Sequence, residues 1–284
     1  MKIGYQGIKG AYSESAIYKH FGSKAEPVGF ETFEDVFEVV ENKKIDCGLL
    51  PFENTIAGSV ALNYDLLLKY DVAIIGEVFL KINHYLLSQK GNTLENIKTV
   101  YSHPHAIEQC KAFIREHKLK IALEYDTAGA AKIVKDRGRI DEAAIASELC
   151  AKIYGLDILK KGIDSSKFNI TKFFIFVRTE NIPHELKKEK TSIAFKTKHY
   201  PGALINCLQR LSKHNINLTK LESRPVPENP WEYVFYADFE GSVDDENVKT
   251  ALSDMEASSL FLKILGSYPA GENLIPAQKD SAKT

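Results

Sequence analysis

From residue 1 to about residue 178 the chain alternates short apolar segments with amphipathic ones. Chains that alternate strands and helices in this way fold into sheets covered by helices, and their strands are mostly parallel. The expected strands are Ile3–Tyr5, Val28–Phe30, Cys47–Leu50, Thr99–Tyr101, Ile121–Glu124 and Ala143–Ala146. The helices that follow the first three strands are expected from about Ser13, after Thr32 and over Val60–Tyr70. Each of the last three strands is expected to lead directly into a helix. The pattern therefore predicts an α/β fold with largely parallel strands.

Two stretches interrupt the alternation. Residues 71–87 contain two successive strand-like runs, Val72–Ile75 and Val78–Ile82, and Phe173–Arg178 is another apolar run. We expect the chain to cross between two subdomains at the first stretch and to return at the second. This predicts one lobe of residues 1–78 with 157–178, another lobe of residues 79–156, and a cleft between them.

The rest of the chain has a different order. Residues 179–190 are polar and contain a proline, which is typical of a linker. Residues 191–268 read strand-helix-strand-strand-helix-strand, the order of a ferredoxin-like unit. The polar residues 269–284 are expected to be disordered.

Composition excludes several classes of function. The net charge is -1 and the pI is about 6.7, so nothing favours binding to nucleic acid or to an anionic membrane. No run of about 18 apolar residues predicts a membrane span, and the N-terminus lacks a signal peptide. The four cysteines are scattered and form no Cys-x-x-Cys pair, which fits a reducing, cytoplasmic location.

The carboxyl ends of parallel strands meet at a crevice where ligands bind. At these points the chain places small or hydroxylated residues before helices, and a helix N-terminus attracts anions. Serine and threonine also cap helices for purely structural reasons. Gly4, Gly7 and Gly10 fit a tight turn near a ligand better than a nucleotide loop. His103 and His105 lack a third ligand at a suitable spacing, so no metal site is expected.

The segment Asn169–Phe173 places an amide, a hydroxyl and a cation together at the start of an apolar strand. The Thr171 hydroxyl does not titrate near pH 7, so it would act as a donor within a hydrogen-bonded network; such acid catalysis contributes about 10²–10⁴-fold. The loop at Glu53, Asn54 and Thr55 could bind a carboxylate or polyhydroxy ligand. Both segments also fit structural roles, as a β-favouring threonine and an ordinary polar loop.

Two segments of the C-terminal region suggest a second small site. Gly202-Ala203-Leu204 opens a helix, and Glu222-Ser223-Arg224-Pro225 ends a strand. A glycine at a helix start beside a polar strand end could form an amino-acid pocket between subunits.

Taken in order, these segments resemble the prephenate dehydratase family from residue 1 to about residue 268, with a C-terminal ACT regulatory domain. The matching segments are Gly7-x-x-Gly10-Ala11-Tyr12-Ser13, Pro51-x-Glu53-Asn54-Thr55-x-x-Gly58-Ser59-Val60, Ser102-His103-Pro104-x-Ala106-x-x-Gln109-Cys110, Asp126-Thr127-Ala128-x-Ala130-Ala131, Ala144-Ile145-Ala146-Ser147, Asn169-x-Thr171-Lys172-Phe173, Gly202-Ala203-Leu204 and Glu222-Ser223-Arg224-Pro225.

The resemblance implies a two-lobed catalytic domain like a type II periplasmic binding protein. It implies the conversion of prephenate to phenylpyruvate with loss of CO₂ and water, a step of phenylalanine synthesis that needs no cofactor. Phenylalanine would bind at an interface of ACT domains and inhibit a homodimer or homotetramer. Because no chorismate mutase helix bundle precedes the family segments, we expect a monofunctional enzyme.

The resemblance also assigns expected roles to residues. Thr171 would protonate the departing ring hydroxyl, with Glu53, Asn54 and Gln109 orienting the ring. The family usually has arginine where this chain has Lys172, and lysine offers a point charge instead of a bidentate fork. The expected substrate contacts are Ala11, Tyr12, Ser13, Thr55, Ser59, Ser102, His103, Thr127, Ser147, Asn169, Lys172 and Phe173. The expected phenylalanine contacts are Gly202, Ala203, Leu204, Glu222, Ser223, Arg224 and Pro225.

Two alternatives stay open at this point. Arogenate dehydratase uses the same chemistry on a substrate with an amino group in place of the keto group. A non-enzymatic binding module coupled to an amino-acid sensor would share the same architecture.

Overall fold

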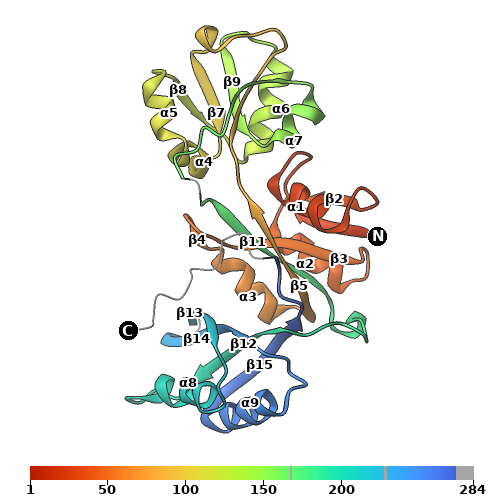
Figure 1. Ribbon diagram of the computed structural model, residues 1–284, viewed down its shortest axis with the longest axis vertical. Coiled ribbons are helices and arrows are strands. Elements are labelled where there is room, and N and C mark those ends of the chain that lie inside the picture. Colours follow the sequence, from red (N-terminus) through yellow and green to blue (C-terminus); the bar gives the residue numbers. More distant parts are fainter. Residues whose placement is uncertain (167, 227–228, 273–284) are drawn as a thin grey trace, which may run out of the picture.

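The computed structural model describes residues 1–166, 168–226 and 229–272. Two α/β lobes and a C-terminal domain follow one another along the long axis of the molecule, with the first lobe in the middle (Figure 1). The predicted two lobes and the separate strand-helix-strand-strand-helix-strand unit are both present. The longest helix among the described residues has 13 residues, and none of those helices is long and apolar enough to cross a membrane.

The first lobe is built on a sheet with the strand order β2-β1-β3-β11-β5, and β4 pairs with β3. Strands β1, β2 and β3 are parallel, but β11 is antiparallel to both β3 and β5 because it returns from the other lobe. The elements of this lobe are β1 (Lys2–Gln6), α1 (Tyr12–Phe21), β2 (Glu26–Phe30), α2 (Phe33–Glu41), β3 (Cys47–Asn54), β4 (Gly58–Ser59), α3 (Ala61–Lys69), β5 (Val72–Lys81) and β11 (Ile170–Arg178).

The second lobe has the strand order β10-β6-β9-β7-β8. Strand β7 is parallel to β8 and β9, whereas β6 is antiparallel to β9 and β10. Its elements are β6 (Tyr85–Ser88), a 3₁₀ turn (Leu94–Asn96), β7 (Thr99–Ser102), α4 (Pro104–Gln109), α5 (Lys111–Glu116), β8 (Lys120–Leu123), α6 (Thr127–Arg137), β9 (Glu142–Ala146), α7 (Glu148–Tyr154) and β10 (Asp157–Lys161). The expectation of largely parallel strands is therefore only partly correct.

The predicted lobe boundaries need two corrections. Strand β5 is one continuous strand of the first lobe, because it pairs with β11 along its length and its polar residue Glu77 is buried rather than marking a break. Residues 157–161 form β10, which pairs with β6 and belongs to the second lobe. The crossing segments are therefore residues 82–84 and, among the described residues, 162–166 and 168–169.

The two crossing segments are hydrogen-bonded to each other. The Ile82 amide donates to the Asn169 carbonyl at 2.7 Å, and the Ile163 amide donates to the His84 carbonyl at 3.1 Å. The lobes are thus joined by a pair of hydrogen-bonded segments outside the strands, and we call these residues the neck.

Helices begin where their capping residues predict. Thr32 and Asp35 form a reciprocal capping box at the start of α2, and Asp126 and Ser147 cap α6 and α7. The N-cap of α4 is His103, and Pro104 occupies the first helical position.

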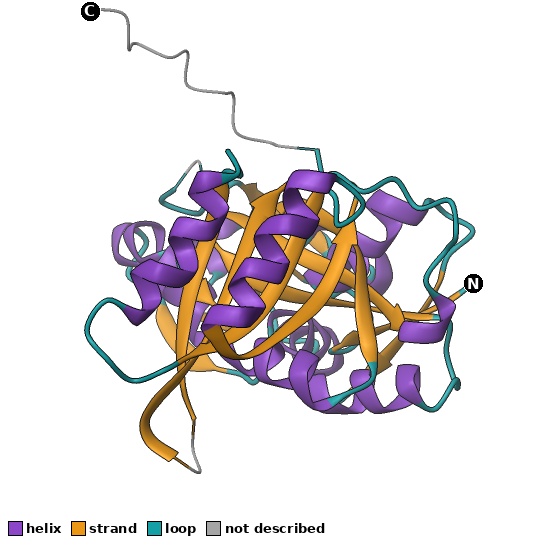
Figure 2. Ribbon diagram, turned by 90° about the horizontal axis from the view of Figure 1, so that it is seen from below, coloured by secondary structure: helices purple, strands orange, loops and turns teal. Residues whose placement is uncertain are grey.

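The C-terminal domain has the strand order β13-β14-β12-β15, with every pair antiparallel. Both of its helices cover one face of this sheet (Figure 2). After a 3₁₀ turn (Thr179–Asn181), its elements are β12 (Lys190–Thr197), α8 (Ala203–Lys213), β13 (Leu218–Val226), β14 (Asn229–Glu240), α9 (Glu246–Ser258) and β15 (Ser259–Tyr268). Most of the predicted disordered tail, residues 273–284, lies outside the described residues.

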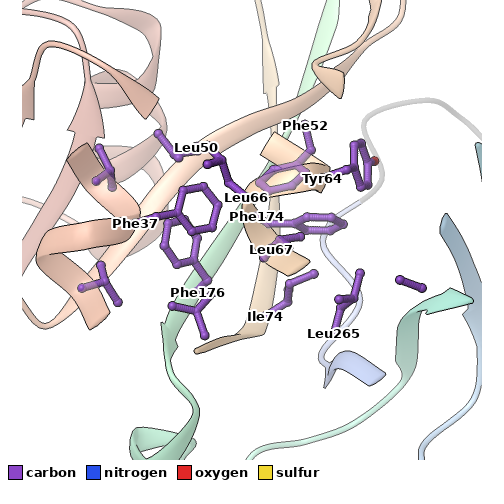
Figure 3. Close-up of a cluster of buried hydrophobic side chains, with 14 of the residues drawn as sticks. Phe37, Leu50, Phe52, Tyr64, Leu66, Leu67, Ile74, Phe174, Phe176 and Leu265 are labelled. Carbon is purple, nitrogen blue, oxygen red and sulfur yellow. The ribbon is translucent and has the colours of Figure 1, made fainter. Parts of the chain in front are cut away.

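The other face of the C-terminal sheet packs on the first lobe. Tyr236 and Leu265 join Phe52, Tyr64 and Phe174 in one hydrophobic cluster, part of which is drawn in Figure 3. The ring centroids of Phe52 and Phe174 are 4.7 Å apart, and those of Tyr64 and Tyr236 are 5.1 Å apart. The polar segment 179–190 suggested a separable domain, but the two units share a core.

Backbone contact at this interface is also close. A Cβ atom on Gly266 of β15 would lie 2.2 Å from the Ile74 carbonyl oxygen of β5. Only glycine allows the strands to approach this far.

Candidate active site

A cavity of about 600 Å³ lies between the two lobes and is bordered by the neck. The starts of α1, α4 and α6 contribute to its wall, together with the end of β3 and the start of β11. Ten predicted site residues line it: Ala11, Tyr12, Ser13, Asn54, His103, Gln109, Thr127, Asn169, Thr171 and Phe173. The helix starts and the Asn169–Phe173 segment therefore meet at one cavity.

The Thr171 side chain is held in a defined orientation by Asn54. The Asn54 side-chain oxygen accepts hydrogen bonds from the amides of Ile56 (2.9 Å) and Ala57 (2.8 Å), so its nitrogen must face the other way. That nitrogen donates to Thr171 Oγ1 at 3.0 Å. Within the described residues the Thr171 hydroxyl has no other hydrogen-bond partner, so its own hydrogen is available to a group in the cavity.

From Asn54 the hydrogen bonds continue through the neck to the second lobe. Asn54 also donates to Asn169 Oδ1 at 2.8 Å, so the Asn169 nitrogen is the donor to Gln109 Oε1 at 2.9 Å. Gln109 Oε1 lies 2.7 Å from His84 Nε2, which must therefore carry a hydrogen. The Tyr12 hydroxyl lies 2.9 Å from the other ring nitrogen of His84 and 2.8 Å from the Asn83 carbonyl, and its single hydrogen is shared between these two acceptors when His84 is neutral. The directions of the bonds from Asn54 to His84 Nε2 follow from the two backbone amides that fix Asn54.

This network leaves donors facing the cavity. Gln109 uses its oxygen twice, and its side-chain nitrogen has no partner among the described residues. Together with the Thr171 hydroxyl it can bind an oxygen atom of a ligand. The arrangement suits a leaving hydroxyl that needs hydrogen bonds as its bond to carbon breaks.

His84 is the residue that the sequence analysis missed. It lies in the neck, is 2% exposed, and its backbone amide donates to Asp164 Oδ1 at 2.8 Å. Burial lowers the pKa of its imidazole below the usual 6.5, although Gln109 and Asp164 oppose this effect. The signal in the sequence is an imidazole just after the apolar run Val78–Ile82, where the chain is expected to cross between the lobes.

We expect the His84 ring to titrate below pH 6.5 and its neutral form to carry the hydrogen on Nε2. Because its folded-state pKa lies below the unfolded value, the unfolded chain binds this proton more tightly, and stability is lost as pH falls below about 6.5. Nitrogen NMR of the imidazole rings, assigned with His84→Asn, measures both the tautomer and the titration. A His84 ring that titrates above pH 6.5 would contradict the network.

The wall around α1 can bind an anion through backbone groups. Gly7 lines the cavity at φ +114°, which only glycine adopts easily, and the turn it makes leads into α1. The N-cap residue Ala11 has no side chain to cap the helix, so first-turn amides near Ser13 lack a side-chain acceptor. Such amides bind carboxylates and phosphates.

Side-chain charge in the cavity is scarce. Among the described residues that line it there is no lysine or arginine, whereas Glu124 and Asp126 are both present and half-buried. The imidazoles of His103 and His105 stack with centroids 5.2 Å apart. Burial lowers the pKa of His103, and His105 lowers it further, while Asp126 opposes them.

Three predicted site residues face away from the cavity and need correction. Lys172, Glu53 and Ser59 point toward the C-terminal domain, because side chains alternate along a strand and their neighbours Thr171 and Asn54 take the cavity face. The amine of Lys172 lies 2.9 Å from a carboxylate of that domain, and Ser59 Oγ donates to another at 2.7 Å. Neither Lys172 nor Glu53 lines the cavity.

Three further predicted substrate contacts are held elsewhere by structural hydrogen bonds. Thr55 donates to the Phe168 carbonyl and accepts from the Ile170 amide at 3.0 Å. Ser102 is fully buried and donates to the Ile145 carbonyl at 2.6 Å. Ser147 caps α7 and donates to the Gly10 carbonyl at 2.7 Å, which ties the second lobe to the first. These hydroxyls stabilise the fold and do not line the cavity.

Only one of the two expected halves of the phenylalanine site lines a depression. Gly202, Ala203 and Leu204 line a depression of about 930 Å³ at the start of α8. Glu222 and Arg224 on β13 instead contact the first lobe, where Arg224 forms an ion pair with Asp65 at 2.9 Å. The alternate residues Ser223 and Pro225 are exposed on the other face of β13, the edge strand of the sheet; they pair with Phe235 and Tyr233 of β14, which line the depression, but do not line it themselves.

Comparison with known proteins identifies the family. The sequence profile of the prephenate dehydratase family matches residues 3–181. The chain is 41% identical to arogenate dehydratase/prephenate dehydratase 2 of Arabidopsis thaliana, over 97% of this chain and 74% of that protein.

Solved structures agree on the fold. A prephenate dehydratase of Arthrobacter aurescens in complex with L-Phe is 27% identical, with a TM-score of 0.86 over 94% of this chain and 89% of that one. GqqA, described as a quorum quenching acylase, is 32% identical, with a TM-score of 0.88 over 95% and 98%. A fold shared with an acylase does not fix the reaction. The family profile matches residues 3–181, and this match shows that the chain belongs to the prephenate dehydratase family.

Proposed function

We propose that this protein converts prephenate to phenylpyruvate in the cavity between its lobes. The observation that carries the proposal is the free hydroxyl hydrogen of Thr171, which Asn54 orients at the cavity wall. The cavity volume of about 600 Å³ suits a small six-membered ring with two acidic substituents.

In the proposed reaction, the bond between the ring and its carboxylate breaks and releases CO₂. The electron pair moves through the ring and expels the hydroxyl from the opposite carbon. Thr171 donates a hydrogen bond to the departing oxygen and passes it one proton, which solvent replaces, so that water leaves. Gln109 supplies a second hydrogen bond. Aromatisation of the ring drives the step.

The substrate carboxylates bind mainly to backbone groups. The uncapped first turn of α1 supports this proposal, because no lysine or arginine lines the cavity among the described residues. One such helix start contributes about 0.3–1 kcal/mol toward a negative charge at an exposed site, and more where water is excluded. Orientation between the lobes, more than charge, then provides the rate enhancement.

The test is incubation of the purified chain with prephenate and chromatographic detection of phenylpyruvate. We expect turnover within the ordinary enzymatic range of about 1–10³ s⁻¹. Binding of prephenate without product would contradict the proposal and favour the binding-module alternative.

A specific observation favours arogenate as a second candidate substrate. Arogenate carries an ammonium group where prephenate has a keto oxygen, and the half-buried carboxylates of Glu124 and Asp126 line the cavity. Paired carboxylates stabilise an ammonium and repel a second anion. Parallel measurement of kcat/KM with both substrates decides between them: a higher value for arogenate would make it the preferred substrate.

We further propose that phenylalanine regulates the enzyme at the C-terminal domain, which would then act as an ACT domain. Support comes from the depression at Gly202–Leu204 and from the L-Phe complex of the Arthrobacter aurescens structure. Ser223 and Pro225 adjoin this depression without lining it and are exposed, so a second copy packed on this face would complete the site. A homodimer, or a homotetramer built from such dimers, would bring the exposed edge strand β13 of one copy to the depression of the other.

A further inference from the structure

The two strands that carry Thr171 and Asn54 have a second set of polar side chains on their opposite face. In the pairing of β3 with β11, Thr171 lies opposite Asn54, and Lys172 lies opposite Glu53. The first pair faces the cavity and the second pair faces the C-terminal domain. Lys172 directly follows Thr171 in the sequence, and Glu53 directly precedes Asn54. A displacement of Lys172 therefore moves the backbone that places Thr171.

Lys172 is fixed to the C-terminal domain by a buried ion pair. Its amine lies 2.9 Å from Asp238 Oδ2 on β14, and the two residues are 8% and 2% exposed. Ser192 donates to the other oxygen of Asp238 at 2.6 Å, so the carboxylate cannot turn freely. Burial opposes the charge on Lys172, but Asp238 and Glu53 together outweigh it and raise the pKa of the amine.

The ion pair belongs to a larger network across the domain interface. Glu53 lies 3.3 Å from Lys172 and 3.2 Å from Lys220 of β13, and Lys220 lies 3.5 Å from Glu222. Opposite charges alternate along this chain of contacts. Burial raises the pKa of Glu53, but the two lysines outweigh it and lower that pKa below the usual value. The charges are therefore held in place on both sides of the interface.

We propose that the Lys172–Asp238 ion pair is a positioning element of the active site, through which the C-terminal domain holds the Thr171 hydroxyl in its productive orientation. The inference rests on the proposed dehydratase function. It makes Lys172 a positioning residue that never touches substrate. It also gives the C-terminal domain a direct physical link to the strand that carries the catalytic hydroxyl.

A second ion pair in the same interface provides a matched control. Lys190 of β12 lies 2.8 and 2.9 Å from the two carboxylate oxygens of Glu77 on β5. This pair also joins the first lobe to the C-terminal domain; Glu77 is buried and Lys190 is half-buried. Glu77 lies opposite Phe174 in β11, and neither residue lines the cavity. We expect loss of the Lys190 amine to weaken the interface while the Lys172–Asp238 contact stays in place.

The experiment compares Lys172→Met with Lys190→Met in steady-state kinetics on prephenate. We expect Lys172→Met to lower kcat by about tenfold with an unchanged KM, since small misplacements of a catalytic group are costly. Lys172→Arg keeps the charge and should recover most of kcat. Lys190→Met should leave kcat at the wild-type value. A rise of KM with unchanged kcat in Lys172→Met would show that Lys172 binds substrate and would overturn the proposal.

A double variant separates positioning from stability. Lys172→Met leaves Asp238 buried and unpaired, whereas Lys172→Met/Asp238→Leu removes both charges, a change that is often neutral for stability. We expect the double variant to regain Tm while its kcat stays low. Recovery of kcat together with Tm would reduce the ion pair to a structural role.

Failure of the proposed function is visible separately, as absence of turnover in the wild type. In that case hydrogen exchange of residues 170–173 tests the positioning claim: faster exchange in Lys172→Met but not in Lys190→Met supports it, and equal exchange refutes it.

Discussion

Replacing Thr171 with valine is expected to lower kcat on prephenate by about 10²–10⁴-fold, the usual contribution of a positioned acid. Valine keeps the branched shape of the side chain but removes the only hydroxyl that Asn54 orients toward the cavity. KM should stay close to the wild-type value, because the hydrogen bond strengthens only as the hydroxyl departs. Steady-state kinetics of the purified variant measures both constants.

Thr171→Ser is the matched control for this change. Serine retains the hydroxyl and loses only a methyl group, so it should keep most of the activity that valine loses. Equal Tm values for the three proteins would show that the fold is intact. Turnover by Thr171→Val near the wild-type rate would remove Thr171 from the mechanism.

Replacing Phe174 with alanine is expected to lower the free energy of unfolding by about 3–5 kcal/mol, the usual cost of deleting a buried aromatic ring. Phe174 is fully buried, and its ring contacts Phe52 of the first lobe and Tyr268 of the C-terminal domain, with centroids 4.7 and 5.6 Å apart. Because this core is shared, the first lobe and the C-terminal domain should lose stability together. Urea unfolding measures the free energy, and hydrogen exchange of β3 and β15 shows which units are affected.

Phe113→Ala is the matched change in the second lobe. Phe113 lies in a separate hydrophobic cluster of that lobe and contacts neither the first lobe's core nor the C-terminal sheet. We expect its loss to increase exchange in the second lobe alone. Exchange that rises in β3 but not in β15 of Phe174→Ala would contradict a shared core.

The sequence predicted the elements that alternate strongly. It also predicted Thr171 and Asn54, because each lies in a short segment that carries several polar side chains. It could not predict the direction in which Lys172 points. Strand β11 is buried on both faces, so its apolar residues show no period of two that would distinguish one face from the other. Only the register with β3 and the position of the C-terminal domain decide that Lys172 faces away from the cavity.

Other errors arose from long-range contacts. Strand β10 is short, largely polar and irregular in its pairing with β6, so only that pairing assigns it to the second lobe. His84 acquires its role from partners 25 and 72 residues away, Gln109 and Tyr12. Ser147 stands between a strand and a helix, as a ligand-binding residue would, but its hydroxyl donates to the Gly10 carbonyl instead. No local pattern contains these contacts.

A crystal structure of the wild-type protein with an unreactive analogue of prephenate tests the central claim most directly. We expect the oxygen at the leaving position to lie within about 3.2 Å of Thr171 Oγ1, the reach of an effective acid, while Lys172 remains paired with Asp238. An analogue whose leaving oxygen lies far from Thr171, or whose carboxylate is bound by Lys172, would contradict it.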